Sequence, residues 1–175
     1  MTVQTKIKTK RYLVYALIIL IAHILQNTVS IFPDILSVKP ILLISVAVCV
    51  SMFEGELVGA CAGFLAGALW DTVTVTADGY NAFYLMVVCA ACGVLLRILM
   101  RNNIVTYTIM NSGITILYVI TYILFFISAR GIDGAGMMFL RYYIPMTLYS
   151  LMLTPLWYIL IRTVYRKFSF DYTEY

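Results

Sequence analysis

The chain has 175 residues, of which 63% are hydrophobic and 11% are charged, and its formal net charge is +4. A soluble protein of this size exposes much of its surface to water and could not cover so many apolar side chains. Ordinary globular domains contain about 45–50% apolar and about 25% charged residues, and disordered chains contain fewer apolar ones still. The composition therefore excludes a soluble domain and a disordered chain, and it predicts an all-α polytopic membrane protein.

Apolar segments follow one another along the whole chain. Most of them are close to the length of roughly 20 residues that a helix needs to cross a hydrocarbon core of about 30 Å. The first follows a basic start and ends before Pro33, and the second begins at Pro40, a favourable first helical residue. The longest connection, 129–137, is too short for an extramembrane catalytic domain. We therefore expect a single integral membrane domain, 1–175, with six spans at about 12–32, 40–53, 57–75, 80–100, 104–128 and 138–161.

The basic residues are distributed unequally between the two sides that six spans would create. Nine Lys and Arg residues fall on the side of both termini, and three fall on the other side. Because cytoplasmic segments of membrane proteins are enriched in Lys and Arg, the asymmetry predicts that both termini are cytoplasmic. The positive charge also predicts contact with anionic membrane lipids and requires no nucleic acid. The nine are Lys6, Lys8, Lys10, Arg11, Arg97, Arg101, Arg162, Arg166 and Lys167, and the three are Lys39, Arg130 and Arg141.

The third predicted span carries glycine at every fourth position, at Gly59, Gly63 and Gly67, and Asp71 continues the series. A step of four residues is close to one helical turn, so these positions share one face of the helix. Glycine lets another backbone approach closely, so this face predicts either tight packing within the chain or docking of another membrane protein. A ligand cavity is the third alternative.

Asp71 lies only a few residues before the loop at 77–79, so we expect it near the membrane surface, where hydration lowers the cost of its charge. One interpretation is that it caps the following turn or pairs with Arg130 or Arg141. The other is that it carries a proton or an ion in transport.

His23, Gln26 and Asn27 fall at positions i, i+3 and i+4 of the first predicted span and share one face. Hydrogen bonding between helices is the expected use of such an intramembrane polar face, at roughly 0.6–2 kcal/mol per bond. His23 is the only histidine of the chain, so we predict no His-based metal site.

The remaining motifs do not indicate an enzyme. Cys89 and Cys92 form a C-x-x-C pair, but they lie in an apolar span without the βαβ context of a redox site. The sequence has no Gly-rich phosphate loop, no nucleophile elbow and no H-E-x-x-H motif. We therefore expect no catalytic residue, no metal and no cofactor.

One stretch of the chain resembles a known family. Pro40 leads into the second predicted span, the motif G-x-x-x-G-F-x-x-G-x-x-x-D covers 59–71, and Gly79 precedes the fourth span. This run, with the length, the six spans and the cytoplasmic ends, resembles MreD, a family of rod-shape-determining membrane proteins of bacterial cell elongation. The motif region covers about 39–85, a quarter of the chain.

The resemblance implies a non-catalytic, multi-pass component of the bacterial inner (cytoplasmic) membrane that takes part in peptidoglycan synthesis and cell-wall organisation. The partners that it implies in the elongasome are MreC, the MreB complex, and RodA with a class B penicillin-binding protein. It also implies a six-helix fold similar to the substrate-binding subunits of energy-coupling-factor transporters, so a vitamin-binding subunit is the alternative function. Those subunits often carry A-x-x-x-A in the first span, whereas Ala16 and Ala22 are six residues apart.

Overall fold

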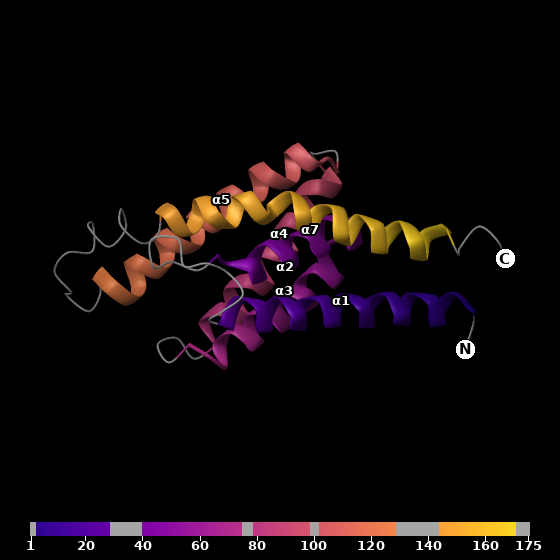
Figure 1. Cartoon of the computed structure of the whole chain (residues 1–175), viewed down its shortest axis with the longest axis horizontal. Helices are drawn as coiled ribbons and strands as arrows, with labels where there is room; N and C mark the ends of the chain where they lie inside the picture. The colour runs from indigo at the N-terminus through magenta and orange to yellow at the C-terminus, as the bar shows by residue number, and fades with distance from the viewer. Residues whose placement is uncertain (1–2, 29–39, 75–78, 99–101, 129–143, 171–175) are drawn as a thin grey trace.

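The computed structural model describes residues 3–28, 40–74, 79–98, 102–128 and 144–170, and the regular structure in these ranges is entirely helical. The all-α class is therefore confirmed. The helices form one bundle, in which helices from the beginning and the end of the chain lie side by side (Figure 1). They are α1 (Val3–Asn27), α2 (Leu42–Glu54), α3 (Glu56–Asp71), α4 (Tyr80–Ile98), α5 (Ile104–Tyr122) with its π-helical continuation η1 (Ile123–Ser128), and α7 (Ile144–Phe170).

α2 is the centre of the bundle and packs against α1, α3, α4, α5 and α7. Every residue from 42 to 52 is buried, and the only hydroxyl side chains among them are Ser45 and Ser51. A helix that is apolar on all faces has no side suited to water, so it takes the interior position. The surrounding helices turn large apolar side chains such as Leu17, Phe83 and Met152 outward.

The N-terminus of α2 lies inside the bundle, and other helices satisfy its amide groups. Gln26 Oε1 of α1 accepts hydrogen bonds from the N–H groups of Leu42 and Leu43 at 2.9 and 3.1 Å. Ser150 Oγ of α7 accepts a hydrogen bond from the Ile41 N–H at 2.7 Å. The first N–H groups of a helix have no partner within it and destabilise the fold if they are buried unpaired. The first and the last helix are therefore both bonded to the central one.

Three helical segments in the described ranges are long and apolar enough to cross a membrane, namely Tyr80–Ile98, Ile104–Phe125 and Ile144–Phe168, and α2 is a shorter apolar helix. Together with the outward apolar side chains, they identify the chain as a membrane protein. α3 has 16 residues and rises about 24 Å, less than the hydrocarbon thickness of about 30 Å. The division into six spans and the single six-helix domain stay predictions.

The first two helices have different ends from the predicted spans. α1 begins in the basic segment, at Val3, because Lys and Arg are good helix formers, and it ends at Asn27 rather than near 32. Residues 29–32 lie outside the described ranges. α2 begins at Leu42 rather than at Pro40, since Ile41 has an extended backbone with φ −89° and ψ 95°.

The later helices begin at the predicted Tyr80 and Ile104, and two of the later ends differ. α3 ends at Asp71 rather than near 75, because the chain turns at the next residue. α7 continues beyond the predicted end at 161 to Phe170, since basic side chains favour the C-terminal turns of a helix and need not stop where the lipid stops. Residues 138–143 and 99–100 lie outside the described ranges.

The first turns of α1 and the last turns of α7 lie at the same end of the bundle (Figure 1). Two ion pairs stand there. Arg11 Nη2 lies 2.8 Å from Glu54 Oε2, with side chains that are 9% and 4% exposed. Arg97 Nη1 lies 2.9 Å from Glu56 Oε1 and is largely exposed. We call this region, with Arg11, Arg97 and the arginines of α7, the basic end.

Candidate functional site

α3 and α4 pack against each other more extensively than any other pair of described helices. A Cβ atom added at Gly63 would lie 2.8 Å from the carbonyl carbon of Leu85, and one added at Gly67 would overlap the backbone of Ala82. Carbon atoms in ordinary contact stand about 3.5–4.0 Å apart, so only glycine allows this approach. Gly59, one turn earlier, faces Ser51 of α2 instead. The predicted glycine face therefore lies against α4 and α2, and its use in partner docking stays a prediction.

α4 contributes a glycine of its own to this contact. A Cβ atom added at Gly93 would lie 2.5 Å from Glu56 Cα at the start of α3. Sequence reasoning did not single out Gly93, although Ala82, Cys89 and Gly93 place small residues at helical spacing along α4. We call the contact made by Gly63, Gly67 and Gly93 the glycine seam.

Asp71 forms the first-turn cap of α4. Its Oδ1 accepts a hydrogen bond from the Asn81 N–H at 3.2 Å, and its Oδ2 accepts one from the Ala82 N–H at 2.9 Å. A carboxylate at a helix N-terminus both satisfies free amide groups and interacts favourably with the helix dipole. These are the contacts that the capping interpretation predicts. The alternative pairing partners, Arg130 and Arg141, lie outside the described residues.

The polar face of α1 is divided between two uses. Gln26 reaches across to α2, as described above. Asn27 Nδ2 donates a hydrogen bond to the His23 carbonyl oxygen at 2.9 Å, and it lies 3.3 Å from His23 Nδ1, so these two side chains interact within α1 itself. Of the three predicted residues, only Gln26 makes a hydrogen bond to another helix in the described ranges.

Buried polar side chains also join α2, α5 and α7 around Asn111. Its Nδ2 donates hydrogen bonds to Ser45 Oγ and Thr154 Oγ1, both at 3.0 Å, and Tyr107 OH donates one to the Ser45 carbonyl oxygen at 2.7 Å. Sequence reasoning missed Asn111, although a carboxamide in an apolar span, with Tyr107 and Thr115 on the same helical face, was a signal for it. Because the members of this cluster come from three helices, the cluster fixes the relative rotation of those helices.

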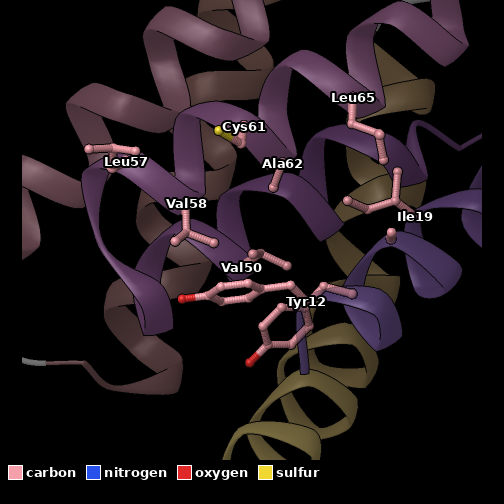
Figure 2. Close-up of a pocket in the computed structure, with 10 residues that line it drawn as sticks. Tyr12, Ile19, Val50, Leu57, Val58, Cys61, Ala62 and Leu65 are labelled. Carbon is pink, nitrogen blue, oxygen red and sulfur yellow. The ribbon is translucent and has the colours of Figure 1, made fainter. Parts of the chain in front are cut away.

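An apolar groove of about 360 Å³ opens between α1 and α3. Figure 2 shows side chains of both helices around it, with Val50 of the central helix among them. α1 provides Tyr12, Ala16 and Ile19, and α3 provides Leu57, Cys61, Ala62 and Leu65. The lining is almost wholly apolar, so the groove suits an apolar partner rather than a polar substrate. We call it the α1–α3 groove.

The four cysteines are all unpaired, and Cys61 is exposed whereas the other three are buried. Within the described ranges, no group of three or more His, Cys, Asp or Glu residues is placed to hold a metal ion. The expectations of no cofactor and no enzymatic activity stay predictions. The α1–α3 groove and a hollow of about 510 Å³ between α4 and α5 are both mainly apolar, so neither favours vitamin binding, which needs placed polar groups.

Comparison with known proteins extends the resemblance beyond the motif region. Residues 6–168 match the family described as rod shape-determining protein MreD, and this match covers all of the described helices nearly completely. Neither the curated proteins nor the solved structures give a match, so the likeness to transporter subunits stays a prediction. Since the family match takes in nearly the whole chain, the protein belongs to the MreD family of rod shape-determining proteins.

Proposed function

We propose that this protein is a non-enzymatic scaffold of the bacterial elongasome, embedded in the inner membrane by six spans with both termini in the cytoplasm. Its family supports a role in rod shape, and its apolar helices support membrane embedding. The single observation that carries the scaffold role is the α1–α3 groove, an open surface with an almost wholly apolar lining.

The shape of the groove fits a helix better than a small molecule. It follows α1 from Tyr12 to Ile19 and α3 from Leu57 to Leu65, a rise of about 11–12 Å along each helix. Its walls include Ala16 and Cys61. Small side chains allow close helix–helix packing, and such packing drives association in lipid, where apolar burial alone gives little.

We infer that the occupant is the single membrane-spanning helix of the bitopic partner MreC. RodA with the class B penicillin-binding protein, and the MreB complex on the cytoplasmic side, then assemble around this pair. A protein with little mass outside the membrane acts on its partners mainly through such helix–helix contacts and short loops.

The experiment fills the groove and measures partner binding. Ala16→Leu and Cys61→Leu add apolar atoms where the incoming helix would lie, and Ala91→Leu makes the same change at an exposed alanine of α4 outside the groove. We expect the double variant to lose co-purification with MreC, whereas Ala91→Leu retains it. Equal recovery of MreC by both proteins, at equal abundance, would contradict the proposal.

The membrane topology is tested separately. Reporter fusions or cysteine labelling are expected to place the C-terminus in the cytoplasm and residues 132–134 outside. An externally accessible C-terminus would refute the six-span arrangement, whatever the groove binds.

A further inference from the structure

A polar pocket of about 250 Å³ lies at the basic end and shares no lining residue with the α1–α3 groove. Arg162 and Arg166 of α7 line it, and their separation of four residues places both side chains on one face of the helix. Both are exposed at the pocket mouth. The other lining residues are Phe53, Asn102, Tyr158 and Tyr165.

The walls of this pocket are held by contacts within the bundle. The Phe53 ring centroid lies 5.5 Å from that of Tyr158 and 5.3 Å from that of Tyr165. The Arg162 guanidinium lies 5.8 Å from the Tyr158 ring centroid, within the range of a cation–π contact. Asn102 Nδ2 donates a hydrogen bond to a backbone carbonyl of α2 at 3.1 Å. The pocket is therefore formed before any ligand arrives.

Charge distinguishes this pocket from the rest of the basic end. The three carboxylates in the described ranges, Glu54, Glu56 and Asp71, bond to Arg11, to Arg97 and to the first turn of α4. No carboxylate of those ranges pairs with the two arginines of the pocket. Two neighbouring guanidinium groups without a carboxylate partner attract an anion. Each planar guanidinium can donate two parallel hydrogen bonds to two oxygens of one phosphate.

We propose that this pocket binds a phosphate group, presented as the headgroup of an anionic membrane phospholipid. Along α7 the exposed side chains change from apolar at Ile159, which is 61% exposed, to basic at Arg162 within one turn. Such a change marks the depth at which lipid headgroups lie, and the aromatic walls are typical of that depth. The inference rests on the membrane placement of α7 and does not require a partner in the α1–α3 groove.

The test uses the purified full chain, alone, in neutral detergent. Phosphatidylglycerol and phosphatidylcholine with identical acyl chains are titrated, and bound lipid is counted by native mass spectrometry. We expect phosphatidylglycerol to bind more tightly, and the double variant Arg162→Gln with Arg166→Gln to weaken it about tenfold or more, since hydrogen bonds to charged groups are lost. The double variant Arg162→Lys with Arg166→Lys keeps the positive charge but loses the paired hydrogen-bond donors of the guanidinium groups. We expect its affinity for phosphatidylglycerol to lie between those of the parent and the Gln variant.

The matched control is Lys10→Gln with Lys167→Gln, which removes the same charge from exposed positions that do not line the pocket. We expect this control to retain the affinity within about threefold, because exposed charges in water and salt act weakly. An equal loss in control and pocket variants, or equal binding of both lipids, would overturn the proposal. Inorganic phosphate separates the sources: if it displaces the lipid at similar concentrations, the pocket serves free phosphate, and if it does not, the lipid headgroup is the ligand.

Discussion

α3 has two faces that contain small residues, and one is packed closely against a neighbouring helix whereas the other borders an open groove. On one face, Gly63 and Gly67 let the backbone of α4 come into contact, and the seam is closed. On the other face, Cys61 and Ala62 line an open groove of about 360 Å³ between α3 and α1. The small residues of the closed face are glycines, whereas those of the open face carry side chains and stand beside larger residues such as Leu65.

The two faces of α3 differ in packing because the helices opposite them, α4 and α1, bring groups of different size to the contact. α4 brings its own backbone and Gly93 to the seam, so nothing holds the helices apart. α1 brings side chains such as Tyr12 and Ile19 to the groove. Two contacts hold it to α2, one from Gln26 to the start of α2 and one from Arg11 to Glu54 at its end. A small-residue pattern therefore shows that close packing is possible, and the neighbouring helix decides whether it occurs.

The largest expected effect comes from opening the seam. Gly67→Leu places a side chain on the backbone of Ala82, and overpacking of this kind typically costs about 1–3 kcal/mol, or more where backbones must separate. We expect low abundance and a reduced Tm when the protein is expressed alone. Gly113→Leu is the control, because an added Cβ at this exposed glycine of α5 meets nothing within 4 Å. Equal stability of the two variants would show that the seam is not closed.

The next effect comes from releasing α1 at the basic end. Arg11→Gln leaves Glu54 nearly buried without its ion pair, which we expect to lower the free energy of unfolding by about 1.5–3 kcal/mol. Arg97→Gln removes the same kind of pair from an exposed site and should cost under about 1 kcal/mol. Thermal unfolding in one detergent measures both. If the two variants lose equal stability, Arg11 does not hold α1 in place.

A smaller effect is expected where the seam ends, at the cap on α4. Asp71→Leu removes both acceptors from the first turn and should cost about 1–2 kcal/mol, whereas Asp71→Asn keeps an oxygen acceptor and should cost less. Thermal stability and growth as rod-shaped cells are measured together. A stable, abundant Asp71→Asn protein that fails to support rod shape would show that the charge itself is needed, and a proton or ion role would replace the cap.

The smallest effect is expected on the open side. Cys61→Leu adds atoms to the exposed wall of the groove, so the free energy of unfolding should stay within about 0.5 kcal/mol of the parent. Gly63→Ala, two residues away on the closed side, should be clearly less stable although it adds only one methyl group. A Cys61→Leu protein as unstable as Gly63→Ala would mean that the groove is closed in the membrane.

Much of this arrangement could be predicted from residue types and spacing. The all-α class follows from composition, and the spacing of four places Gly63 and Gly67 on one face before any neighbour is known. The sequence could not show that this face packs against α4. A glycine indicates that another backbone can come close, but it does not indicate which helix does so. Helix ends were harder, since α7 continues through basic residues after its apolar segment ends.

The polar contacts were the least predictable part. A carboxamide in an apolar span indicates that a partner exists, and it does not say which helix supplies it. Gln26, Asn27 and His23 share one face in sequence, yet only Gln26 reaches α2 in the described structure. Tyr107 and Thr115 share the face of Asn111 at helical spacing, but this pattern does not say that the side-chain partners of Asn111 come from α2 and α7.

The capping of α2 has a consequence for biosynthesis. Gln26 is available as soon as α2 has been made, since it precedes Leu42 by 16 residues. Ser150 follows Ile41 by 109 residues, so its hydroxyl reaches the ribosome exit only about 5–22 s later at roughly 5–20 residues per second. Until then the Ile41 amide must be hydrated or bound by the insertion machinery. The buried centre of the bundle is therefore completed last, when the final helix arrives.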